Sequence, residues 1–105
     1  MRTKVRVEDQ VEAFVKSLAP EPRRRTVRQA IKGLAEDRGD TKPLEGKLSQ
    51  FHRQRVGHYR VLYPERFEKR TRVIECVFAR ERLVVYEMFL QLQTEELVRW
   101  AREKK

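Results

Sequence analysis

Residues 53–63 read Arg-Gln-Arg-Val-Gly-His-Tyr-Arg-Val-Leu-Tyr. Apolar residues with high β propensity stand on both sides of the Gly57-His58 pair. This arrangement predicts a tight turn between two antiparallel strands, near residues 51–56 and 59–64. A third strand is expected at residues 72–80, after a charged hairpin loop, and residues 83–88 are expected to pair beside it as a fourth strand.

In the residues before this segment, the spacing of apolar side chains changes from every second residue, typical of a strand, to the spacing of a helix. Residues 4–7 alternate polar and apolar, which predicts a short first strand. Two amphipathic helices are expected next, with Pro20 and Pro22 at their junction and Gly39 as the cap of the second. Their apolar stripes are Val11, Phe14, Val15 and Leu18, then Val27, Ala30, Ile31 and Leu34. Thr94, followed by two glutamates, predicts the start of a last helix.

This order of elements predicts an α+β fold. An N-terminal strand (1–7) and an α-helical hairpin (8–38) would pack on a mainly antiparallel sheet of four or five strands (48–90), with a C-terminal helix at 94–104. A chain of 105 residues can build one modest hydrophobic core, so residues 1–105 are expected to form a single domain.

The composition points to a polyanionic partner. Twenty-five basic and 16 acidic residues leave a formal net charge of +9. No apolar run approaches the roughly 18 residues that a membrane span needs, and no signal peptide is evident. The lone Cys76 suits a reducing compartment, so we expect a cytoplasmic protein. One cysteine and two histidines offer no convincing metal site, and no cofactor is expected.

Arginines and tyrosines recur on the predicted strands. A guanidinium group is a planar fork of donors that stays charged at physiological pH, which suits it to phosphodiesters. The alternative is a solvated charged face whose arginines pair with Glu45 or Glu75. We favour phosphate binding because six arginines converge on adjacent strand ends where acidic residues are sparse.

Three motifs carry a resemblance to a known family. They are Leu44-Glu45-Gly46, the run from Arg53 to Tyr63 (Arg-x-Arg-Val-Gly-x-Tyr-Arg-Val-x-Tyr), and Arg80-x-Arg82-x-x-Val85-Tyr86. Together they resemble the RelE branch of the RelE/ParE toxin superfamily, over nearly the whole chain. The resemblance implies the toxin of a toxin–antitoxin pair: a metal-independent endoribonuclease that cleaves messenger RNA in the ribosomal A site. It also implies a cognate antitoxin, and a hetero-oligomer formed with it.

The resemblance also implies a site. The catalytic roles fall on Arg53, Arg60, Arg80 and Tyr86, with Arg55 and Arg82 as further phosphate contacts. Arg53 is a poor general base because a guanidinium does not release its proton. His52 or His58 would then supply the base, which stays unassigned, and His52 is also expected to contact RNA. Arg24 and Arg28, in a basic run of the second helix, either contact ribosomal RNA or serve solubility.

Two other functions stay open. One is a ParE-like inhibitor that docks on DNA gyrase without nuclease activity, and the other is a non-catalytic RNA-binding relative. Several single residues have simpler expectations. Tyr59, Tyr63 and Cys76 are expected to fill core, and Glu75 to pair with an arginine.

Overall fold

The computed structural model describes residues 2–93. The helix expected at 94–104, with its Thr94 cap, lies outside the described residues. The elements, in chain order, are β1 (Arg2–Val7), α1 (Asp9–Ser17), α2 (Glu21–Gly33), η1 (Leu34–Glu36), β2 (Asp40–Pro43), η2 (Gly46–Leu48), β3 (Phe51–Val56), β4 (Tyr59–Glu68), β5 (Thr71–Cys76) and β6 (Phe78–Glu81). Residues 85–93 are helical. The predicted α+β class is confirmed.

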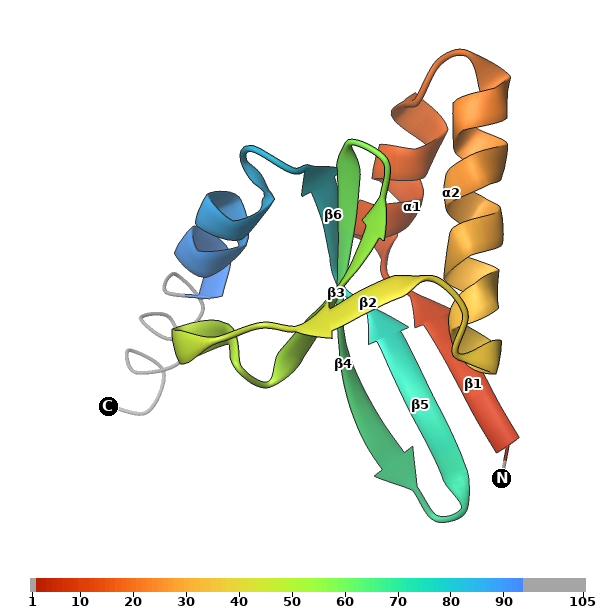
Figure 1. The fold of residues 1–105 in the computed structure, drawn as a ribbon, viewed down its shortest axis with the longest axis vertical. Coiled ribbons are helices and arrows are strands. Elements are labelled where there is room, and N and C mark those ends of the chain that lie inside the picture. Colours follow the sequence, from red (N-terminus) through yellow and green to blue (C-terminus); the bar gives the residue numbers. More distant parts are fainter. Residues whose placement is uncertain (1, 94–105) are drawn as a thin grey trace.

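The six strands form one sheet in the order β1-β5-β4-β3-β2, with β6 also paired to β4. Only the β1–β5 pair is parallel; the other pairs are antiparallel. β4 is long enough to serve two sets of partners, because its first half pairs with β3 and β6 and its second half with β5. Figure 1 shows how β4 connects the two halves of the sheet.

The helical hairpin α1–α2 covers one face of the sheet (Figure 1). Val11, Phe14 and Val15 of α1 and Val27 and Ile31 of α2 are buried there, as their spacing predicted. Alternate residues of the strands pack against these helical side chains. They are Val56, Val61, Tyr63, Ile74, Cys76 and Ala79. Burial raises the pKa of the Cys76 thiol to about 12. Its expected role as packing is confirmed.

The opposite face carries a smaller core cluster, and here one expectation is wrong. Residues 83–88 do not form a strand. Residues 82–84 form a turn, and a helix begins at residue 85. Val85 and Phe89, four residues apart, are both buried against Phe51, Leu62 and Phe78. Four-residue spacing brings side chains to one face of a helix. Figure 1 shows this helix on the side of the sheet away from α1 and α2.

The end of α2 also differs from expectation. α2 continues into the 3₁₀ turn η1, and the residue in the left-handed conformation after it is Asp37 (φ 57°). An aspartate tolerates this conformation because its short polar side chain can bond locally. Gly39 (φ 104°) lies beyond that turn and leads into β2. Gly39 therefore does not cap the helix. The residues that follow it form the short strand β2.

A shift of register divides the expected strand at 72–80 into β5 and β6. Between the Glu65–Ile74 and Leu62–Phe78 pairs, β4 advances by three residues while its partner advances by four. The extra residue is Val77, whose N–H donates to the Leu62 carbonyl at 3.0 Å. A one-residue insertion of this kind is a β-bulge, and it reverses which face each following side chain occupies. Before the bulge Ile74 and Cys76 face α1 and α2; after it Phe78 faces the opposite side.

Candidate functional site

Three of the arginines singled out in the sequence lie in one row across the sheet. Arg55 of β3 is the register partner of Arg60 of β4, and Arg60 is the register partner of Arg80 of β6. Directly paired residues on antiparallel strands have Cα atoms about 4.5–5.5 Å apart, and their side chains share a face. We call Arg55, Arg60 and Arg80 the arginine row. By strand register its residues point to the sheet face away from α1 and α2, as expected, but the Arg80 guanidinium lies near the Phe14 ring of α1.

The arginine row has no acidic partner within residues 2–93: none of its three guanidinium groups forms an ion pair there. Within the described residues Arg60 donates to the backbone carbonyls of Gly57 and Tyr59, each at 2.9 Å. Like charges placed directly opposite one another destabilise a sheet. An anion bound across the row would relieve that repulsion.

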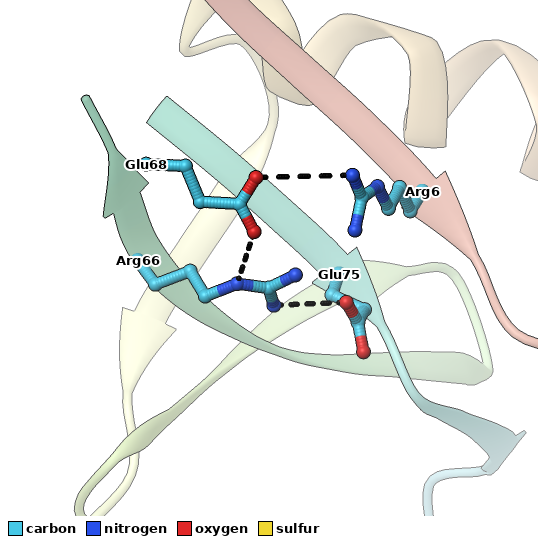
Figure 2. A network of polar contacts seen from close by, with 4 residues as sticks. All are labelled: Arg6, Arg66, Glu68 and Glu75. Atoms are coloured by element: carbon cyan, nitrogen blue, oxygen red, sulfur yellow. Dashed lines mark hydrogen bonds and ion pairs between the residues drawn. The ribbon is translucent and has the colours of Figure 1, made fainter. Parts of the chain in front are cut away.

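The other end of β4 provides a contrast (Figure 2). Arg66 there bonds Glu75 at 2.8 Å and Glu68 at 3.1 Å, and Arg6 lies 3.8 Å from Glu68. The hydrogen bond from Arg66 is the main cause that lowers the pKa of Glu75. The expected pairing of Glu75 with an arginine is confirmed. These arginines are neutralised within the fold, whereas the arginine row is not.

Arg53 and Tyr86 meet at a hollow beside the arginine row. Arg53 shares its face with Arg55, two residues further along β3, and its guanidinium contacts Asp40 Oδ1 at 3.3 Å. Tyr86, in the helix that begins at residue 85, is half-buried. The two side chains line a cavity of about 450 Å³. Its other lining residues are Lys42, Pro43, Leu44, Glu45 and Leu48.

Arg80 lies at the end of the row, beside α1. Its guanidinium carbon is 5.9 Å from the centre of the Phe14 ring, within the range of a cation–π contact. Its Nε is buried and has no hydrogen-bond partner among the described residues. A buried donor without an acceptor is costly, so an acceptor that approached Arg80 would remove part of that cost.

The two histidines predicted as candidate bases do not lie on the face of the arginine row. His52 has the opposite parity to Arg53 on β3, and its ring stacks on Tyr63 (5.4 Å between centroids) on the side of α1 and α2. His58, in the β3–β4 turn, lines a separate depression with Pro22 and Arg23 of α2. The expectation that either histidine serves as the base at the arginine row is therefore not supported by position, because strand alternation turns His52 away.

Arg24 and Arg28 belong to the helical hairpin. Arg24 donates to the Leu18 carbonyl at 2.5 Å, and Arg28 lies 3.5 Å from Glu12, so both tie α2 to α1 or its end. A contact between them and ribosomal RNA stays a prediction for the opposite side of the molecule. Arg82 is exposed in the turn after β6, where its N–H bonds the His58 carbonyl at 2.8 Å. It lies just beyond the arginine row.

Sequence reasoning missed two residues of the site. Lys42 of β2 is the register partner of Arg53, which adds a cation to the same face. Glu45 brings a carboxylate to the hollow that Arg53 and Tyr86 line. Both belong to a short stretch that contains Pro43 and Gly46, residues typical of turns. The weak signal was the alternation of Asp40 and Lys42, which is too short to stand out.

The arrangement can bind an extended polyanion. The arginine row brings three arginines to neighbouring strand positions, and Arg53 and Lys42 extend this set of cations toward the hollow. Tyr86 supplies an aromatic ring on which a base can stack.

No group of three histidine, cysteine or acidic residues within residues 2–93 is arranged to hold a metal ion. No helix in that part of the chain is long and apolar enough to span a membrane.

Comparison with known proteins gives matches among solved structures. No protein-family model and no curated protein matches the chain. A chain of the RelBE2 toxin–antitoxin complex from Mycobacterium tuberculosis superposes with a TM-score of 0.58 at 28% identity, covering 78% of this chain and 100% of that one.

Two further structures share the fold. A chain of the archaeal RelE–RelB complex from Pyrococcus horikoshii OT3 gives a TM-score of 0.51 at 24% identity, covering 78% of this chain and 97% of that one. The YoeB/ParE toxin from Agrobacterium tumefaciens gives 0.51 at 14% identity, covering 75% and 98%.

The sheet, its helical hairpin and these matches together define a RelE-like α+β fold. The chain is accordingly placed in the RelE/ParE-like toxin superfamily, and the resemblance stated from its sequence is confirmed.

Proposed function

We propose that this protein is the toxin of a toxin–antitoxin pair and an endoribonuclease that cleaves messenger RNA on the ribosome. The observation that carries the proposal is the arginine row: three arginines paired in register on adjacent strands, without a carboxylate partner in the described chain. The similarity to chains of the RelBE2 and RelE–RelB toxin–antitoxin complexes supports the toxin role.

The proposed chemistry is attack of the RNA 2′-hydroxyl on the adjacent phosphorus. Negative charge grows on the phosphate oxygens in the transition state, and preorganised donors stabilise it strongly. Arg60 and Arg80 would hold those oxygens, with Arg55 and Arg53 aligning the strand on either side. Tyr86 would stack on a base next to the cleaved bond. The products would be a 2′,3′-cyclic phosphate or a 3′-phosphate and a 5′-hydroxyl.

Glu45 is our candidate for the group that accepts the proton from the 2′-hydroxyl. Its carboxylate lines the hollow beside Arg53 and Tyr86, whereas both histidines lie elsewhere. We expect Glu45→Gln to slow cleavage by about 10²–10⁴-fold, the usual contribution of general acid–base catalysis, with RNA affinity unchanged. Single-turnover rates and fluorescence anisotropy measure the two quantities. A wild-type rate in this variant would remove Glu45 from the mechanism.

A cognate antitoxin is the proposed partner, in a hetero-oligomer. The similarity to chains of two toxin–antitoxin complexes supports this. Exposed apolar side chains near the site suit a protein partner: Leu83 is 84% exposed, and Val84, Met88, Leu90 and Leu92 are exposed along the same segment. An antitoxin seated there would also reach Tyr86.

Toeprinting on ribosomes programmed with a defined message tests the proposed function. The wild type should cut within the A-site codon, and Arg80→Ala should not cut. Absence of cuts with the wild type would overturn the nuclease. A DNA gyrase supercoiling assay would then decide whether the ParE-like alternative holds.

A further inference from the structure

Gln10, near the start of α1, makes two hydrogen bonds to one residue of β6. Its Nε2 donates to the Ala79 carbonyl at 2.9 Å, and its Oε1 accepts from the Ala79 N–H at 2.8 Å. This is the donor–acceptor pattern by which a neighbouring strand would pair with Ala79. β4 holds the other side of β6. The side chain of Gln10 therefore completes the pairing of a strand of only four residues, Phe78–Glu81.

The position of Ala79 matters because Arg80 follows it. The bulge at Val77 is what turns Arg80 to the face of Arg60 and Arg55, since without the extra residue Arg80 would face α1 and α2. A short strand that follows a bulge has few bonds with which to keep its register. The two bonds from Gln10 fix β6 at the residue next to Arg80.

α1 contacts Arg80 itself one helical turn further on. Phe14, four residues after Gln10, faces the same side of α1 and places its ring 5.9 Å from the Arg80 guanidinium carbon. The ring is anchored in turn, with its centroid 5.5 Å from that of Tyr59 in an edge-to-face contact. One face of α1 thus constrains both the backbone and the side chain at the end of the arginine row.

We propose that Gln10 is a positioning residue for Arg80: it holds β6 so that Arg80 stays in register with Arg60 for a phosphodiester bound across the row. The inference rests on the proposed function, in which Arg80 binds RNA phosphate. Gln10 acts through Ala79 and does not itself touch RNA.

The test compares Gln10→Met with Gln29→Met. Both substitutions remove a glutamine amide from a helix and conserve its length, but Gln29 is exposed on α2. Hydrogen exchange by NMR should show the Ala79 amide exchanging roughly threefold to tenfold faster in Gln10→Met, the fold-change of one lost hydrogen bond. Gln29→Met should leave that amide unchanged. Equal protection of Ala79 in Gln10→Met and wild type would overturn the proposal.

A double-mutant cycle with Arg80→Ala separates positioning from general stability. We expect Gln10→Met to weaken binding of a short single-stranded RNA by about threefold to tenfold in the wild-type background, and to have no effect once Arg80 is alanine. If the loss persists in the Arg80→Ala background, Gln10 does not act through Arg80 and the proposal is wrong. If Arg80→Ala itself binds RNA as the wild type does, the proposed site falls and the role of Gln10 with it.

Gln10→Glu is the second variant, used if Gln10→Met does not fold. Its carboxylate can still accept the Ala79 N–H but cannot donate to the Ala79 carbonyl at neutral pH. The same cycle should again show a loss that depends on Arg80. If Gln10→Glu weakens RNA binding equally with Arg80 and with alanine at position 80, the proposal is overturned.

Discussion

Arg60→Ala is expected to slow RNA cleavage by about 10²–10³-fold, the cost of removing one preorganised donor from an anionic transition state. Arg60 is the middle of the arginine row, so its loss also separates Arg55 from Arg80. The fold should survive, because within residues 2–93 the Arg60 side chain bonds the nearby carbonyls of Gly57 and Tyr59 and no distant element. Single-turnover cleavage on programmed ribosomes gives the rate, and circular dichroism gives the fold.

Two further variants make this result specific. Arg70→Ala removes the same charge from the exposed β4–β5 turn at the far end of β4, and it should cleave as the wild type does. Arg60→Lys keeps the charge but loses the planar fork, so only part of the rate should return. An equal loss in Arg60→Ala and Arg70→Ala would mean that net charge, and not the arginine row, determines cleavage.

Two of the three residues of the arginine row, Arg55 and Arg60, could be placed from local sequence. Gly57 takes the left-handed conformation (φ 58°) that a two-residue hairpin turn requires, and Gly57-His58 indicated that turn. Once the turn is fixed, the register that opposes Arg55 and Arg60 follows, because alternation and turn length leave no other pairing. The same alternation places Gln54 on the side of the helices, where its register partner is Val61. It is fully buried there and donates to the Ala30 carbonyl at 2.6 Å.

The position of Arg80, the third residue, was not predictable in this way. Arg80 reaches the row only because Val77 is bulged, and a bulge depends on how β5 and β6 pair with distant parts of β4. Residues 83–88 were expected to be a strand because valine and tyrosine favour strands, yet burial of Val85 and Phe89 against Leu62 fixes a helix there. Tertiary packing overrides a weak local propensity in such a short segment.

Dependence on tertiary contacts also explains why Lys42 and Glu45 were not predicted as residues of the site. Lys42 and Glu45 lie on either side of Pro43, in a stretch rich in turn-forming residues. Their place in the site comes from the pairing of β2 with β3 and from the helix at 85–93, which closes the hollow with Tyr86. Each of these contacts joins residues distant in sequence, so local pattern carries no sign of them.

Leu62→Ala is expected to lower the free energy of unfolding by about 3–5 kcal/mol, within the range measured for leucines removed from well-packed cores. Leu62 is fully buried at the centre of the cluster under the helix of residues 85–93, between Arg53 of β3 and Phe78 of β6 in register. Urea unfolding followed by circular dichroism measures the change, with an unaltered dependence on urea as the sign that only stability has changed.

Leu83→Ala is the matched control for this substitution. Leu83 is 84% exposed in the turn that leads into the same helix, so the same chemical change should shift stability by no more than about 0.5 kcal/mol. Equal small shifts in both variants would mean that the helix of residues 85–93 does not close over Leu62. The hollow that holds Arg53 and Tyr86 would then lack one wall, because Tyr86 is carried by that helix. A large loss in Leu62→Ala alone would instead show that the cluster supporting the candidate site is also a main source of the stability of the fold.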